Sequence, residues 1–233
     1  MHVGIDEAGR GPLIGDMVVA GVLASPEALG KLVERGLKDS KQLSPAKRYD
    51  LYKSALSLGV VAVAVYVPPW RIERENLNDI EVKSIEWILR TMKPLLAEEV
   101  RELRVYVDEI KGRASVLAAL VKKVFAEYNV GFTMEAGADS KYPAVALASV
   151  VAKVSRDASL LALKECVGDF GSGYVTDSRT RTWVQENSAQ CTSPPVFIRA
   201  NWGTLKKMAP AWYRCKKAKG TRKQRSLLDY LKQ

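Results

Sequence analysis

The first 24 residues, MHVGIDEAGRGPLIGDMVVAGVLA, contain the pattern that decides the fold. Two apolar runs, Met1–Asp6 and Met17–Ala24, lie on either side of the glycine- and proline-containing segment GRGPLIG. Apolar runs bounded by residues of this kind are typical of β-strands. The stretch therefore predicts a strand, a tight loop and a second strand, with Asp6 and Glu7 where the first strand ends.

Three further strands are predicted along the chain. Apolar runs lie at Val60–Val67, Arg104–Asp108 and Val130–Met134, and the double proline at 68–69 follows the first of them. Proline has no N–H to donate to a sheet, so it marks the end of that strand. The run at 104–108, RVYVD, places its two valines on one face and a carboxylate at its end.

Helices are predicted between the strands. Ser44 followed by Pro45 matches an N-cap with proline in the first turn, and this helix should run to about Leu56. Apolar residues recur at helical spacing within 85–92 and within 117–128, and a long helix rich in small residues is expected after Pro143. Strands that come first as a pair and then alternate with helices predict an α/β fold, with a central mixed sheet flanked by helices.

The composition limits the class of protein. The chain has 233 residues, of which 47% are hydrophobic and 27% charged, and it lacks the run of about eighteen apolar residues that a membrane span needs. His2 is its one histidine, which excludes histidine triads and multi-histidine zinc sites. The cysteines at 166, 191 and 215 form no CxxC pair, and the N-terminus has no secretory signal pattern. We expect a reduced, cytoplasmic protein that is monomeric and does not bind membranes.

The positive charge is concentrated at the C-terminus. The net charge is +10, and residues 187–233 hold 11 basic residues and one acidic residue. The rest of the chain is balanced, and the densest basic segment is RCKKAKGTRKQR at 214–225. Such an arm favours a polyanionic partner, most often nucleic acid. An acidic membrane surface or a solvated tail without a specific role are the alternatives.

Four carboxylates have positions that point to chemistry. Asp6 and Glu7 end the first strand, Asp108 ends the fourth, and Asp139 precedes the long helix. Hard divalent cations such as Mg²⁺ and Mn²⁺ prefer oxygen ligands of this kind, and two such ions can together support phosphodiester hydrolysis. Taken singly, each could be a helix cap or an exposed loop residue, and Asp139 could cap the helix that follows it.

Beyond these patterns, the chain resembles the type 2 ribonucleases H over most of residues 3–207. Six segments occur in that family's order: GIDEAGRGPLIGDMVVAGV (4–22), KDSKQLSPAKR (38–48), YVDEI (106–110), ADSKYPAVALASVVAKVSRD (138–157), GSGYVTDSRT (171–180) and IRANWGTLKK (198–207). The resemblance implies an RNase H-like fold with a helical C-terminal extension. It divides the chain into a catalytic domain at 1–205 and a basic tail at 206–233.

The resemblance also implies an activity. The family's enzymes hydrolyse the RNA strand of RNA–DNA hybrids and incise duplex DNA on the 5′ side of a lone ribonucleotide, leaving 3′-hydroxyl and 5′-phosphate ends. By this resemblance Asp6, Glu7, Asp108 and Asp139 are the catalytic residues and bind two Mg²⁺ or Mn²⁺ ions. Glu109 is not counted, because neighbouring side chains on a strand point to opposite faces.

A second group of residues is implied to contact the substrate. The loop at the ribose would be formed by Gly9, Arg10 and Gly11, and glycines there let the backbone approach the substrate closely. Tyr174 would hydrogen-bond the 2′-hydroxyl, and its alternative role is a tyrosine at the edge of the core. Ser40 and Lys41 would contact backbone phosphates, and the alternative for Lys41 is an ordinary exposed lysine.

The chain ends in QRSLLDYLKQ, which resembles the peptide by which replication and repair proteins dock on the sliding clamp. The matching positions are Gln224, Leu227, Tyr230 and Leu231. One helical turn can place the three apolar side chains in a single pocket while the glutamine hydrogen-bonds beside it. The alternative is a short amphipathic helix that packs on the body of the protein.

Two other functions remain open from the sequence. A nuclease of the same fold could cleave DNA junctions, although a ribose-contacting loop argues against a substrate without 2′-hydroxyls. A non-catalytic adaptor could instead bridge hybrid nucleic acid and the clamp. The four carboxylates argue against the adaptor, because negative charge at a phosphate contact weakens binding.

Overall fold

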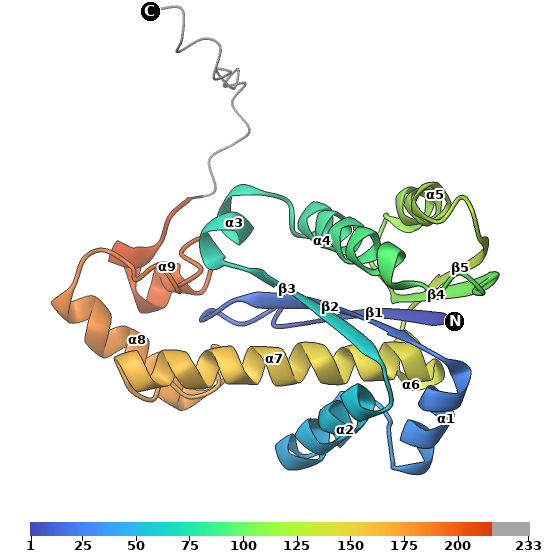
Figure 1. The fold of residues 1–233 in the computed structure, drawn as a ribbon. Coiled ribbons are helices and arrows are strands. Elements are labelled where there is room, and N and C mark those ends of the chain that lie inside the picture. Colours follow the sequence, from blue (N-terminus) through green and yellow to red (C-terminus); the bar gives the residue numbers. More distant parts are fainter. Residues whose placement is uncertain (216–233) are drawn as a thin grey trace, which may run out of the picture.

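A computed structural model describes residues 1–215 (Figure 1). Residues 216–233 lie outside this description, and with them lie the predicted clamp-binding residues. The five predicted strands form one mixed sheet in the order β3-β2-β1-β4-β5. β1 pairs antiparallel with β2 and parallel with β4, β3 is antiparallel to β2, and β5 is parallel to β4. The strands are β1 (His2–Ala8), β2 (Met17–Ala24), β3 (Val61–Val67), β4 (Glu102–Asp108) and β5 (Asn129–Glu135).

Helices cover both faces of the sheet (Figure 1). One face packs on α4 (Leu77–Met92) and α5 (Ala114–Val124), and the other packs on α1 (Pro26–Glu34), α2 (Pro45–Ser57) and α7 (Pro143–Val167). Helix α7 lies directly on β1, because a Cβ atom on Gly4 would be only 2.1 Å from the carbonyl carbon of Ala144. The mixed sheet flanked by helices is therefore confirmed.

Sequence patterns located most elements correctly. The Ser44 hydroxyl accepts a hydrogen bond from the N–H of Lys47 at 3.2 Å, as an N-cap should, and α2 ends at Ser57. The expected long helix is α7. The helix predicted within 117–128 ends earlier than expected, since α5 stops at Val124. Tyr128 instead lies in the turn before β5, where its ring packs edge-on against Phe125.

The C-terminal extension is helical, as expected. It contains α8 (Ser178–Gln190) and α9 (Leu205–Met208), whose buried residues Val184 and Leu205 pack with Leu13 and Ile14 in a separate apolar cluster. Short helices α3 (Pro69–Arg74) and α6 (Ala138–Lys141) complete the set of α-helices within 1–215. None of the helices in this part of the chain combines the length and apolar character needed to cross a bilayer.

Candidate active site

Two of the predicted carboxylates lie next to each other at the ends of the central strands. β1 and β4 run parallel with Ile5 opposite Val107, so Asp6 and Asp108 are the next pair along the strands. Side chains alternate between the two faces of a strand, and Ile5 and Val107 pack in the core beside α4. Asp6 and Asp108 therefore share the opposite face, which α7 covers.

Asp6 is held in a buried, polar environment and is only 7% exposed. Ser149 of α7 hydrogen-bonds to its carboxyl group, and the N–H of Glu7 donates to its Oδ1 at 2.8 Å. The Oγ atom of Ser149 is also 2.7 Å from the Oγ of Ser40, which places Ser40 beside the site. Burial and the neighbouring charge of Glu7 raise the pKa of Asp6 well above its usual value. A bound cation would counteract both effects.

Glu7 joins this pair although it follows Asp6 directly in the strand. Its carboxyl group shares a hydrogen bond with that of Asp6. Burial raises the pKa of Glu7, Arg10 lowers it and the charge of Asp108 raises it again. Three carboxyl groups thus interact electrostatically at one end of the sheet.

Asp139 lies in α6 and is 6% exposed. It does not cap α7, because the N-cap position of that helix is Tyr142. Its Oδ2 accepts a hydrogen bond from Nζ of Lys41 at 3.0 Å, and this bond is the main cause of the raised pKa of Lys41. The N–H of Ala138 donates to Oδ1 of Asp108 at 3.0 Å, which ties α6 to the end of β4. Lys41 is therefore an exposed lysine that is bonded to one of the predicted carboxylates, and its contact with phosphates stays a prediction.

Asp6, Glu7 and Asp108 line a cavity of about 10 Å³, close to the space that one water molecule needs. Glu81 of α4 also lines it, whereas Asp139 does not. Within residues 1–215, no three His, Cys, Asp or Glu side chains already stand as a group that could hold a metal ion. The donor set nevertheless fits a hard divalent cation, because every polar residue lining the cavity is a carboxylate.

The predicted ribose loop follows β1 directly and requires glycine at its first position. Gly9 has φ +83°, and a Cβ atom there would be 2.2 Å from Nε of Arg156 and 2.8 Å from the carbonyl oxygen of Asp16. Gly11 has more room, since a Cβ atom would only reach ordinary contact with Cε1 of Tyr174 at 3.7 Å. The tight packing therefore fixes the start of the loop and leaves its end open.

Arg199 holds this loop through hydrogen bonds from the C-terminal part of the chain, and no sequence pattern indicated that role. It is fully buried and donates hydrogen bonds to the carbonyl oxygens of Gly9 at 2.6 Å, Arg10 at 2.9 Å and Gly15 at 2.9 Å. Burial and the nearby Arg156 lower the pKa of Arg199 to about 9. The available signal was a single arginine next to the apolar residues Phe197 and Ile198.

Tyr174 lies beside the same loop. The carbonyl oxygen of Gly173 accepts hydrogen bonds from the N–H groups of Leu13 at 2.8 Å and Ile14 at 3.2 Å, which join the GSGY segment to the segment after β1. The Tyr174 side chain is 39% exposed, and the guanidinium of Arg156 lies 5.7 Å from its ring centre. Tyr174 is therefore accessible from the side of the loop, and its contact with the ribose stays a prediction.

Arg10 reaches from the loop to α4. Its guanidinium donates to the carboxylate of Glu81 and to the side-chain oxygen of Asn78. The first turns of α4 therefore fix the side chain of the central loop residue. The structure thus places Asp6, Glu7 and Asp108 around one cavity with Glu81, and Asp139 lies outside that cavity, bonded to Lys41. Ser40 and Ser149 lie beside Asp6, and Arg199 holds the loop.

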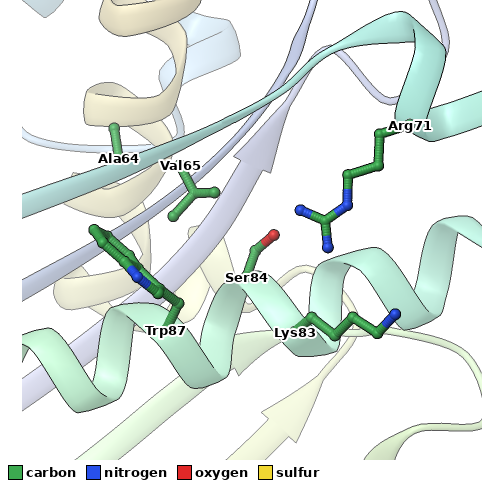
Figure 2. A pocket seen from close by; sticks show the side chains of 6 residues that line it. All are labelled: Ala64, Val65, Arg71, Lys83, Ser84 and Trp87. Carbon is green, nitrogen blue, oxygen red and sulfur yellow. The ribbon is translucent and has the colours of Figure 1, made fainter. Parts of the chain in front are cut away.

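A second pocket, of about 350 Å³, lies between β3 and α4 (Figure 2). Trp87, Ser84, Lys83 and Arg71 line it, and none of the predicted site residues does. Both Lys83 and Arg71 are paired with Glu75, at 2.6 Å and 2.9 Å. The carboxylate end of β1 and β4, and not this pocket, is therefore the candidate active site.

Solved structures show the class of protein to which this fold belongs. A ribonuclease H2 from Pyrococcus horikoshii matches with a TM-score of 0.77 and 32% identity, covering 91% of this chain and 98% of that one. The structure titled as the PCNA:RNase HII complex from Archaeoglobus fulgidus matches with a TM-score of 0.72 and 34% identity, covering 88% of this chain and 95% of that one. The fold is therefore RNase H-like.

Sequence comparisons narrow the class to one family. The family model for ribonuclease HII matches residues 3–205. A ribonuclease HII from Hyperthermus butylicus is 44% identical in an alignment 232 residues long, which covers 98% of this chain and 94% of that protein. The chain belongs to the ribonuclease HII family, and it is an RNase H-type endoribonuclease.

Proposed function

We propose that this protein hydrolyses the RNA strand of RNA–DNA hybrids and incises duplex DNA on the 5′ side of a single embedded ribonucleotide. The observation that supports it is the position of the ribose loop between the carboxylates and Tyr174: the loop follows Glu7 in the chain, and a Cβ atom on Gly11 would lie 3.7 Å from Cε1 of the tyrosine. A phosphodiester next to a ribose in this loop would lie beside the carboxylates. The products are a 3′-hydroxyl and a 5′-phosphate.

Each group at the site has a defined task in this proposal. Asp6, Glu7, Asp108 and Asp139 hold two divalent cations, Mg²⁺ or Mn²⁺. Such ions, when bound, supply activation of the attacking water and stabilisation of the departing 3′-oxygen. The main chain of Gly9, Arg10 and Gly11 faces the ribose, and the hydroxyl of Tyr174 hydrogen-bonds its 2′-oxygen.

The phosphates beside the cleaved bond need positive charge that the carboxylates do not provide. Lys41, anchored by Asp139 at 3.0 Å, supplies it as a point charge next to the site. Ser40 adds a hydroxyl to the same contact. Lys41 keeps 78% of its side chain exposed, so it remains accessible to a phosphate.

The test uses duplex DNA that carries one ribonucleotide, incubated with purified full-length protein in Mg²⁺ or Mn²⁺. We expect a single cut 5′ to the ribonucleotide, none in chelator and none with the Asp6→Asn variant. Sizing the products on a denaturing gel locates the cut. Tight binding without cleavage in either metal would contradict the proposal and favour the adaptor.

Family membership favours the enzyme over a non-catalytic adaptor, and the ribose loop favours ribonucleotide-containing substrates over DNA junctions. An all-DNA junction is therefore the matched negative substrate in the same assay. Cleavage of that junction at a rate similar to that of the ribonucleotide-containing duplex would contradict the assigned substrate.

We also propose that the C-terminal peptide docks on a sliding clamp through Gln224, Leu227, Tyr230 and Leu231. Support comes from the peptide's spacing and from the related Archaeoglobus fulgidus protein, whose structure is that of a complex with PCNA. Deleting 224–233 should abolish clamp binding while leaving cleavage of short duplexes unchanged. Equal clamp affinity of the full-length and shortened proteins would remove this proposal.

A further inference from the structure

Glu81 of α4 carries a carboxylate that the sequence patterns did not single out. The residue is only 1% exposed. Buried carboxylates normally have all of their oxygens paired, because loss of hydration is costly. Here Oε1 accepts from the guanidinium of Arg10, whereas Oε2 is buried and has no hydrogen-bond partner among the described residues. One oxygen is thus satisfied and the other is not.

The place of Glu81 suggests what the second oxygen is for. Glu81 lines the same 10 Å³ cavity as Asp6, Glu7 and Asp108. Burial, followed by the charge of Glu7, raises the pKa of Glu81 to about 7, and Arg10 partly offsets this. Four carboxyl groups therefore line a space of about one water molecule, and Arg10 is paired with one of them, Glu81.

Pairing with Arg10 does not by itself explain a glutamate. A glutamine would offer the same side-chain oxygen to the guanidinium and would add no buried charge. Asn78 already shows that a neutral oxygen is an adequate partner, since it accepts from the other terminal nitrogen of Arg10. The negative charge and the unpaired Oε2 at position 81 call for another partner.

We propose that Glu81 is a fifth carboxylate of the cation site, whose Oε2 accepts a hydrogen bond from a water ligand of a divalent cation held by Glu7 and Asp108. The proposal rests on the metal-dependent reaction proposed above. Mg²⁺ keeps several waters when it binds to proteins, and carboxylates that orient metal ligands change metal affinity by about 10- to 100-fold. Glu81 is in this sense a positioning residue.

The test compares Glu81→Gln with Asn78→Ala in the full-length protein without nucleic acid. Calorimetric titration with Mn²⁺, and separately with Mg²⁺, measures cation affinity directly. Glu81→Gln keeps an acceptor for Arg10 but loses the charge, so its affinity should fall by about tenfold. Asn78→Ala removes the other Arg10 contact without changing charge, and its affinity should stay within about twofold. Glu81→Asp, which restores the charge one methylene shorter, should recover part of the affinity.

Several outcomes would overturn the proposal. Equal cation affinity of Glu81→Gln and the unmodified protein would reduce Glu81 to a partner of Arg10, and equal losses in Glu81→Gln and Asn78→Ala would do the same. If the unmodified protein bound neither cation, the metal-dependent reaction would fail together with this role for Glu81. Thermal unfolding of each variant, once in chelator and once in saturating Mn²⁺ without chelator, gives a second measure: the rise in Tm between the two conditions should be smallest in Glu81→Gln.

Discussion

At the scale of single residues, the site depends on atoms that sequence patterns reveal unequally. Asp6, Glu7 and Asp108 were predictable, because each stands at the end of an apolar strand and strand ends meet at one edge of a sheet. The role of Glu81 was not predictable from the sequence. It lies in helix α4, where the apolar residues produce the helical pattern and the glutamate adds nothing to it. Whether its oxygens are paired depends on Arg10, which is 71 residues away in the chain.

Gly9 gives the sharpest prediction at this scale. Alanine there must adopt φ +83° and place a methyl group 2.2 Å from Nε of Arg156. We expect Gly9→Ala to lower the free energy of unfolding by roughly 1–3 kcal/mol and to slow cleavage strongly. Gly11→Ala is the matched control, because its methyl group would sit at an ordinary 3.7 Å from Tyr174. Thermal unfolding of both variants checks this, and equal Tm values would contradict it.

Asp108 gives a second prediction. Asparagine can still accept the hydrogen bond that the N–H of Ala138 donates at 3.0 Å, so the fold and substrate binding should be kept. The charge needed for a cation is lost, and turnover should fall by at least about a hundredfold, since metal stabilisation is worth several kcal/mol. The control is Glu109→Gln, at the neighbouring exposed carboxylate. The test measures the cleavage rate and the affinity for an RNA–DNA hybrid of both variants side by side. A fully active Asp108→Asn variant would exclude a catalytic role for Asp108.

At the scale of elements, the strands were easier to predict than the helices. All five strands are apolar runs with clear stops, and the structure places each within two residues of the expected bounds. The resemblance implied a helical C-terminal extension, but no residue pattern located helix α8 in it. Its sequence, SRTRTWVQENSAQ, is mostly polar, and its buried residues are Thr180 and Val184. It is stabilised by packing on the C-terminal cluster and not by a pattern of its own.

Arg199 connects the C-terminal part of the chain to the loop after β1, and a substitution there tests how much this connection stabilises the fold. Lysine cannot reproduce its bonds to three carbonyl oxygens of residues 9–15, and buried carbonyls left unpaired cost about 1–3 kcal/mol each. We expect Arg199→Lys to lower the free energy of unfolding in urea by roughly 2–4 kcal/mol. Arg214→Lys, at an exposed arginine, should change it by less than about 0.5 kcal/mol. Similar urea midpoints for the two variants would contradict this role.

At the scale of the whole molecule, negative and positive charges are concentrated in different parts of the chain. Carboxyl groups cluster at one end of a sheet buried on both faces, while the excess positive charge lies in the C-terminal segment. Clustered like charges destabilise the folded chain when nothing neutralises them. Repulsion between these carboxyl groups therefore lowers the stability of the folded protein at the place where, in our proposal, cations and a polyanionic substrate bind.

This instability predicts how stability changes with pH. The folded pKa of Glu81 is about 7 and its usual value is 4.5, because it is buried and faces Glu7. Between these values the folded state binds more protons than the unfolded state, so this group's contribution is fully present below pH 4.5 and is lost as pH rises through 7. The loss amounts to up to about 3 kcal/mol.

In chelator, Glu81→Gln should therefore gain stability relative to the unmodified protein between pH 5 and pH 8. Because the difference between the two proteins is used, titration of carboxyl groups that do not interact with Glu81 cancels. Saturating Mn²⁺ should shrink the gain at pH 8, since the cation neutralises Glu7 and Asp108 and, in our proposal, holds a water against Glu81. Urea unfolding at both pH values, with and without Mn²⁺, measures all four differences, and a gain that did not change with pH would show that Glu81 is not strained by charge.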